Sequence, residues 1–288
     1  SILCELEIEM PSPRKGETKK DFVSRCMSSD KSVKSFPNSL QRVAFCHSQF
    51  ESKGNHIFNK AESAHDIDSI RYEGNPNFKQ LDEMKAAIPM ITIDWEDILP
   101  EPPENSSSET KRDLKYLQDK TRSLSEKEVD LVMDVDETPE NLFKDYCQQK
   151  GLTYPSEMIE EILDQADTVV TTLKYKHRRA RPEQIAHKMG YVVSVIRTRS
   201  HQTPAYPSGH QMHGTITGLV LSDIYPEHTR AFERIEDLSG LARILQGVHF
   251  KGDNDASKAL GRELWKNMKE NILISKYDPF TKWFDNEQ

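Results

Sequence analysis

The sequence has no long hydrophobic run. None of its 288 residues lie in a stretch that approaches the ~18 consecutive apolar residues of a membrane-spanning helix, so membrane insertion is not expected. The first ten residues, SILCELEIEM, have neither the basic start nor the long apolar core of a secretory signal. Both absences favour a soluble, cytoplasmic protein.

The chain also lacks an excess of positive charge. It carries 39 Lys and Arg against 47 Asp and Glu, a net charge of -8. General nucleic-acid binding is driven by neutralisation of phosphates and is therefore not expected. A local basic pocket remains compatible with this total.

Cysteine is scarce, and the four cysteines (Cys4, Cys26, Cys46 and Cys147) follow no zinc-type spacing. We expect no metal site, and we expect these residues to be small buried hydrophobes in a reducing compartment. A Cys26–Cys46 contact is left open, because spacing alone does not fix cysteine pairing.

Alternating strand patterns are nearly absent; only MITIDW, residues 90–95, suggests a short strand. Four later stretches carry apolar residues at helical intervals and predict an all-α bundle. They are residues 155–176, 208–225, 227–248 and 255–272.

A change in composition at residues 99–112, LPEPPENSSSETKR, suggests a linker. Residues 1–98 would then form a small helical module and residues 113–288 a second domain. Two helices are expected early in the module, the later one capped by Asn38 or Ser39. Thr138 and Pro139 suit the start of another helix.

The segment LKYKHRRARP, residues 173–182, is the most basic in the chain. On a helix, Lys174, Arg178 and Arg181 would share one face before Pro182 ends or bends the helix. Like charges repel on one face, so a bound anion would compensate the arrangement. The alternative is a solvated basic face.

The segment TPAYPSGHQM, residues 203–212, precedes a helical pattern. Ser208 suits an N-cap, and the free backbone N–H groups at a helix start can bind an anion. Gly209 allows the anion to approach closely, and His210 could donate a proton. The alternative is a capped helix with an incidental histidine.

The segment ARILQGVHFKGDNDA, residues 242–256, places His249 four residues before Asp253. A carboxylate at that spacing can hold one imidazole N–H and leave the other nitrogen as a nucleophile or base. Gly247 suggests a turn that lets Arg243 and His249 point to one side. The alternative is a surface His–Asp pair.

Together the three segments supply cations, backbone donors, two imidazoles and one orienting carboxylate. Cations stabilise the charge of a phosphoryl group during its transfer. We therefore expect phosphoryl chemistry, with one histidine attacking phosphorus and the other protonating the leaving oxygen.

These segments resemble the acid phosphatase / type-2 phosphatidic acid phosphatase (PAP2) superfamily, which includes vanadium haloperoxidases. Its pattern is K-x6-R-P, then P-S-G-H, then S-R-x5-H-x3-D. The likeness covers roughly residues 140–270 and is greatest for soluble class A acid phosphatases. Ala242 departs from the pattern, because it stands where the family has Ser, and we expect altered support of the site rather than an inactive enzyme.

The resemblance implies a helical phosphatase domain that hydrolyses phosphate monoesters through a phosphohistidine. His249 would be the nucleophile, Asp253 would orient it, and His210 would be the general acid. No metal or other cofactor is implied, although vanadate could bind as a phosphate mimic. The phosphate oxygens would be held by Lys174, Arg181, Ser208, Gly209 and Arg243.

Two further residues stand near these motifs. Arg178 is interpreted as a candidate for the substrate rim, and His213 as a bystander on a helix face. The substrate would be a small-molecule phosphate ester, and the family likeness suggests a homo-oligomer.

The N-terminal segment, MPSPRKGETKKDFVSRCM (residues 10–27) followed by FPNSLQRVAFCHSQF (residues 36–50), resembles a segment of tailed-bacteriophage structural proteins. It could serve docking to phage proteins, and the chain would then act in a virion or in the host cytoplasm. Three other functions stay open: a vanadium-dependent haloperoxidase, a virion structural protein with an inactive phosphatase domain, and, least favoured, a nucleic-acid binder using KHRRAR.

Overall fold

The computed structural model describes residues 11–14, 16–54, 64–198 and 200–274. Within these ranges the chain is all-α, as predicted, and the one β-type contact is an isolated bridge between Arg71 and Arg179. No helix in this part of the chain is both long and apolar enough to cross a lipid bilayer.

The strand predicted at residues 90–95 is wrong. These residues form turns and irregular backbone, and Met90 is buried against the main core. Side chains take the place of a partner strand: the Met90 N–H donates to Gln165 (2.8 Å), and the Thr92 N–H donates to Asn267 (2.8 Å). The alternation therefore reflects packing against helices.

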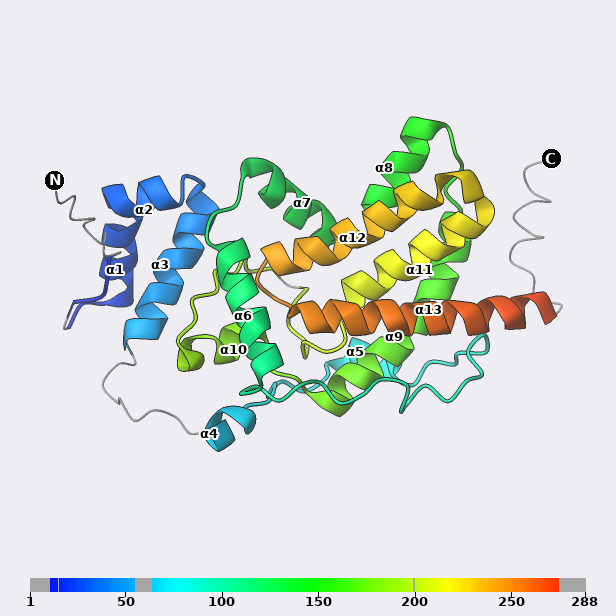
Figure 1. The fold of residues 1–288 in the computed structure, drawn as a ribbon, viewed down its shortest axis with the longest axis horizontal. Helices are drawn as coiled ribbons and strands as arrows, with labels where there is room; N and C mark the ends of the chain where they lie inside the picture. Colours follow the sequence, from blue (N-terminus) through cyan, green and yellow to red (C-terminus); the bar gives the residue numbers. More distant parts are fainter. Residues whose placement is uncertain (1–10, 15, 55–63, 199, 275–288) are drawn as a thin grey trace.

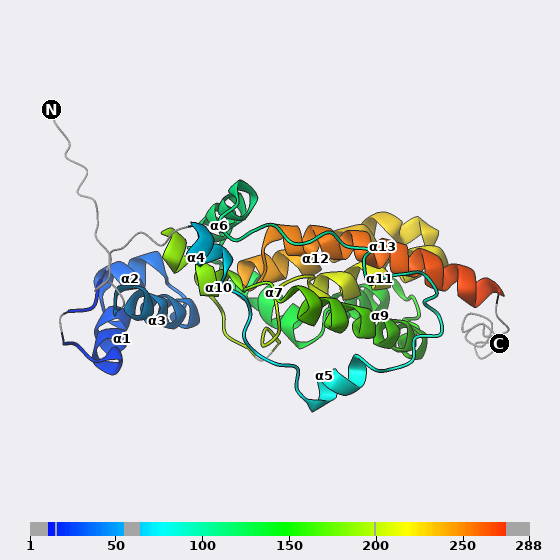
Figure 2. The same ribbon diagram turned by 90° about the horizontal axis from the view of Figure 1, so that it is seen from below.

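Three helices begin the described chain and lie at one end of the molecule (Figures 1 and 2). They are α1 (Lys19–Met27), α2 (Asp30–Ser35) and α3 (Ser39–Gly54), where two helices were expected. Asn38 caps α3, because its side chain accepts from the Leu40 and Gln41 N–H groups. A small separate core holds them together, formed by Phe22, Cys26, Phe36, Phe45 and Cys46.

Cys26 and Cys46 form a disulfide between α1 and α3. The expectation that these two cysteines are free thiols is therefore wrong. Disulfides are favoured by an oxidising compartment, whereas the expectation assumed a reducing compartment. Cys147 is a free buried thiol as expected, and burial raises its pKa to about 11. Cys4 lies outside the described residues.

Five helices connect this end to the main bundle: α4 (Ala64–Asp68), α5 (Phe78–Glu83), α6 (Ser108–Thr121), α7 (Glu126–Glu137) and α8 (Asn141–Lys150). Thr138 ends α7 instead of starting a helix, and Glu140 occupies the N-cap of α8, so that predicted helix start was wrong by two residues.

The range 99–112 packs against the rest of the chain. Asn105 is buried and donates to the Ile67 and Ile70 carbonyls, and α6 already begins at Ser108. The side-chain amide of Asn105 thus fixes this range to the end of α4. The division of the chain into two domains at this range stays a prediction.

The main bundle consists of α9 (Ser156–His177), α11 (Gly209–Ile224), α12 (Thr229–Leu245) and α13 (Lys251–Ile274). The short α10 (Pro182–Ile185) and two 3-10 turns, His187–Met189 and Pro226–His228, complete it. Helix α11 lies among α9, α12 and α13 (Figures 1 and 2) and is apolar around most of its circumference, as a central helix must be.

This packing brings four chain segments to one end of the bundle. They are the C-terminal turns of α9 and α12 and the N-terminal turns of α11 and α13. Each of the three sequence motifs falls on one or two of these segments.

Candidate active site

Helix α9 ends at His177, earlier than the basic motif suggested. Arg178 follows as a left-handed C-cap with φ 50°, and Arg181 is the N-cap of α10, with Pro182 in its first position. The prediction that Lys174, Arg178 and Arg181 share one helix face is therefore wrong. Arg181, the residue before Pro182, has an extended backbone, as is usual before a proline.

Arg178 does not line the site. Its guanidinium donates to the carbonyls of Tyr72 and Gly74 and to the side chain of Asn75. It holds the 72–75 segment, and its interpretation as a substrate-rim residue is not supported by these contacts.

Lys174 and Arg181 converge although they leave different elements. Lys174 Nζ donates to the Pro204 carbonyl (2.9 Å), and Arg181 donates to the carbonyls of Thr203 and Val248 (2.8 Å each). Both cations are buried. Burial and the nearby Arg181 set the pKa of Lys174 well below its usual value, while burial and Arg243 lower the pKa of Arg181 to about 9.

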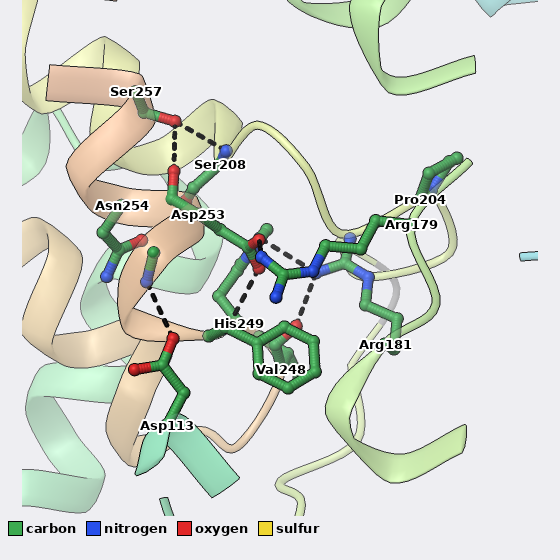
Figure 3. A network of polar contacts seen from close by, with 12 residues as sticks. Asp113, Arg179, Arg181, Pro204, Ser208, Val248, His249, Asp253, Asn254 and Ser257 are labelled. Atoms are coloured by element: carbon green, nitrogen blue, oxygen red, sulfur yellow. Dashed lines mark hydrogen bonds and ion pairs between the residues drawn. The ribbon is translucent and has the colours of Figure 1, made fainter. Parts of the chain in front are cut away.

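His249 lies between Arg181 and Asp253 (Figure 3). Its Nδ1 is 3.1 Å from Asp253 Oδ2, and its Nε2 is 2.9 Å from Arg181 Nη1. Because a carboxylate accepts and a guanidinium donates, the proton belongs on Nδ1, and Nε2 presents a lone pair. Burial and Arg181 set the pKa of His249 well below its usual value, which keeps the ring neutral.

Asp253 has a second charged partner that the sequence did not single out. Arg179 Nη1 is 2.7 Å from Asp253 Oδ1, and both side chains are buried (Figure 3). Arg179 also stacks 4.2 Å from the centre of the Phe250 ring and donates to Thr110. The only sequence signal for Arg179 was its place among the five basic residues of KHRRAR.

The PSGH motif starts α11 as predicted, with Ser208 at the N-cap. The Ser208 N–H, however, donates to Ser257 Oγ (2.6 Å), so the prediction that this N–H is a free anion donor is wrong. Ser208 Oγ is instead buried without a hydrogen-bond partner in the described structure. Gly209 is the first residue of α11, where a backbone N–H has no intrahelical acceptor.

His210 is half-buried in the first turn of α11, with Nε2 3.5 Å from the Asp136 carbonyl oxygen. Burial, Arg243 and His213 together set the pKa of His210 well below its usual value. An anion bound beside His210 would oppose this effect, because negative charge stabilises the imidazolium.

Arg243 lies beside the site, where it forms an ion pair with Asp136. Its Nη1 lies 2.7 Å from Asp136 Oδ1, and its Nη2 donates to Ser200 Oγ (2.9 Å). Asp136 Oδ1 also accepts from Gln246 (3.0 Å). Burial alone would raise the pKa of Asp136, but the Ser200 and Arg243 hydrogen bonds hold it at about 2. Sequence reasoning missed Asp136, which lies over a hundred positions from Arg243.

Gly247 takes φ +81°, and the turn predicted there is present. It ends the last turn of α12, which carries Arg243, and starts the segment with His249. Ala242 is buried on the same turn of α12.

His213 and His201 are further histidines near the motifs. His213 is bonded through both ring nitrogens to carboxylates, so its interpretation as a bystander is wrong. His201, which the sequence did not suggest, is buried, and burial together with Arg181 lowers its pKa to about 4.

The arrangement suits a tetrahedral oxyanion. Three buried cations, Lys174, Arg181 and Arg243, act on a neutral imidazole whose Nε2 lone pair accepts from Arg181. An unpartnered hydroxyl and a helix N-terminus add further donors. Within the described ranges, no group of three or more His, Cys, Asp or Glu residues is placed to hold a metal ion.

Comparisons with known proteins agree with this chemistry. No family model matches the chain. A non-specific acid phosphatase of Salmonella typhimurium is 39% identical over 57 residues, which are 20% of this chain and 23% of that protein. One from Providencia stuartii is 32% identical over 102 residues, 34% of this chain and 39% of that protein.

These matched segments span well under half of the relatives' own lengths. Among solved structures, a bacterial vanadium-dependent iodoperoxidase is similar with a TM-score of 0.49 and 14% identity, over 62% of this chain and 53% of that one. The segments matched in sequence are thus similar to non-specific acid phosphatases. The comparisons give no support to the likeness between the N-terminal segment and bacteriophage proteins.

Proposed function

We propose that this chain is a phosphatase that hydrolyses small phosphate monoesters through a phosphohistidine at His249. The observation that carries the proposal is the orientation of His249: Nδ1 is held by Asp253, and the Nε2 lone pair faces Arg181. A nucleophile directed at a cluster of cations suits an anionic electrophile. The likeness to acid phosphatases supports the same reaction class.

The substrate phosphoryl group would bind where Lys174 and Arg181 converge. Those cations now donate to backbone carbonyls, and phosphate oxygens would replace these acceptors. Ser208 Oγ, buried and without a partner, would donate a further hydrogen bond. The proposal also assigns the Gly209 N–H and Arg243 to phosphate oxygens.

In the first step His249 Nε2 attacks phosphorus, and the bond between phosphorus and the ester oxygen breaks. His210 gives its proton to the leaving oxygen, so the alcohol departs neutral. The phosphoryl dianion beside His210 raises the pKa of that imidazole in the complex, which allows it to carry the proton.

In the second step water attacks the phosphohistidine, and neutral His210 takes the proton of the water. The phosphorus–Nε2 bond breaks, inorganic phosphate is released, and His249 returns to its starting form. Asp253 keeps the proton on Nδ1 and stabilises positive charge on the ring throughout.

Charge stabilisation is assigned to Lys174, Arg181 and Arg243, so no metal is needed in the proposal. The same donors fit vanadate, a tetrahedral oxyanion of similar charge, which should inhibit competitively. Oxidation of bromide by the vanadate-loaded protein with peroxide would favour the haloperoxidase alternative instead.

The test is hydrolysis of p-nitrophenyl phosphate in the presence of a metal chelator. We expect activity that vanadate inhibits and that His249→Ala abolishes. His187→Ala is the matched control, since His187 is exposed on a 3-10 turn outside the site and should retain activity. A folded native protein that neither hydrolyses the ester nor binds vanadate contradicts the proposal.

A further inference from the structure

His213 lies one helical turn after His210 on α11 and is held by two carboxylates from other elements. Its Nδ1 is 2.8 Å from Glu140 Oε1 at the start of α8, and its Nε2 is 2.7 Å from Asp167 Oδ1 on α9. The second oxygen of Glu140 accepts from the Thr138 hydroxyl. The contacts of His213 therefore join three helices.

This geometry determines the charge of the ring. Ionised carboxylates only accept hydrogen bonds, so each imidazole nitrogen has to carry a proton, and His213 is an imidazolium. Burial alone would lower the pKa of His213, but Asp167 and Glu140 hold it well above its usual value. Burial alone would raise the pKa of Glu140. The hydrogen bond from His213 instead holds the pKa of Glu140 at about 2.

Two of the three helices that His213 joins, α11 and α9, also carry a group of the proposed active site, and the third, α8, follows directly after α7, which carries Asp136. Three residues before His213, α11 carries His210. Lys174 stands seven residues after Asp167, which is two turns along the same face of α9. Four residues before Glu140 stands Asp136, whose carbonyl faces His210 and whose carboxylate holds Arg243.

Other charged groups also act on the two histidines. Glu83 on α5 faces the Asp167–His213 pair and accepts from Thr171 (2.9 Å). His210 faces Arg243 of α12 and Asp136 at the end of α7 in addition to His213. Without the positive charge of His213, the negative charges of Glu140, Asp167 and Glu83 would be less neutralised. Their negative field would then favour the protonated form of His210.

We propose that His213 is a positioning residue for the proposed phosphatase reaction. Its two ion pairs fix the first turn of α11 against α8 and α9, and its permanent positive charge makes His210 a stronger acid. The role of His210 rests on the proposed function, whereas the charge state of His213 does not.

The first test is NMR of the native protein with ¹⁵N-labelled histidine, which reads the charge of each ring without any assay of activity. We expect both nitrogens of His213 to be protonated from pH 5 to about pH 8. A His213 ring with one unprotonated nitrogen at pH 7 overturns the proposal, and this result needs no variant.

The second test compares His213→Gln with His213→Lys, which retains a positive charge, and with the exposed control His187→Gln. In His213→Gln the pKa of His210, followed by NMR, should rise by about one unit, with little change in His213→Lys or the control. The basic limb of the kcat/KM profile should move to higher pH by the same amount, and kcat should fall about tenfold.

An unchanged pKa of His210 in folded His213→Gln overturns the proposal. If the native protein lacks phosphatase activity and does not bind vanadate, the proposed function fails, yet the NMR shifts still decide whether His213 controls the charge of His210. Thermal unfolding of each variant separates a local effect from a loss of the fold.

Discussion

Arg179 and Asp253 form a buried ion pair, with 2.7 Å between Nη1 and Oδ1 (Figure 3). The other Asp253 oxygen accepts from the Phe250 N–H and faces His249 Nδ1. Burial raises the pKa of Asp253, and Arg179 opposes that effect. The arginine thus keeps charged the carboxylate that orients the proposed nucleophile.

Replacing Arg179 by Met should therefore impair the site through Asp253. The pKa of Asp253 rises without its counter-charge, so the acid limb of the activity profile should move to higher pH, and kcat should fall on the order of 100-fold. The loss of one partner of a buried pair should also lower the free energy of unfolding by about 3–5 kcal/mol. Activity against pH and chemical denaturation measure both effects.

Arg178→Met is the matched control, because Arg178 neighbours Arg179 but binds the 72–75 segment. Arg179→Lys keeps the charge and should recover part of the activity. If Arg179→Met retains the native pH profile and kcat, Arg179 does not act through Asp253.

Ser208→Ala tests the unpartnered hydroxyl. Since Ser208 Oγ makes no hydrogen bond in the described structure, its removal should leave thermal stability nearly unchanged. The affinity for phosphate and vanadate should fall about tenfold, as expected for a lost hydrogen bond to a charged ligand. Titration of the native and variant proteins with vanadate measures the difference.

Ser257→Ala provides the contrasting case, because Ser257 Oγ accepts from the Ser208 N–H and donates to the Asp253 carbonyl, so both of its bonds are within the protein. This variant should lose stability rather than acquire a selective defect in phosphate affinity.

Equal affinity for vanadate in native protein and Ser208→Ala would argue against an anion contact at the Ser208 hydroxyl.

Asp136→Asn should strengthen anion binding. In the native structure Asp136 neutralises Arg243 and presents negative charge beside the site. An amide removes that charge, so the inhibition constants of phosphate and vanadate should fall about tenfold. Weaker or unchanged inhibition would mean that Arg243 needs Asp136 to stay in position.

Acid should destabilise the fold as Asp136 and Glu140 take up protons, because the folded pKa of each is about 2. A carboxyl group whose pKa is lower in the folded than in the unfolded chain stabilises the fold at pH values above its pKa in the unfolded chain, which is near 4. This stabilisation is lost as the pH falls toward 2. Glu140 should contribute on the order of 2 kcal/mol after allowance for its partial exposure. Denaturation at pH 5 and pH 2.5 should show a smaller difference in Glu140→Gln than in the native protein; an equal difference contradicts this assignment.

The sequence predicted the features that depend on local spacing. The apolar periodicity anticipated α9, α11, α12 and α13, and the four-residue interval anticipated the contact between His249 and Asp253. Gly247 indicated a turn correctly, because a positive φ is accessible to glycine.

Features that depend on tertiary packing could not be predicted in this way. A single left-handed residue, Arg178, turns Arg179 rather than Arg178 toward Asp253, and no pattern in KHRRAR distinguishes the two. The pairing of Asp136 with Arg243 and the disulfide of Cys26 and Cys46 join residues whose separation carries no periodic signal.

The central claim is tested most directly by trapping the covalent intermediate. The native protein, mixed with a ³²P-labelled aryl phosphate and quenched in alkali, should carry label on His249, located by peptide mapping. His249→Ala should carry none, and His210→Ala should accumulate more label, because it lacks the group that activates water. An active protein that is labelled at His210, or that shows no labelled histidine, contradicts the account.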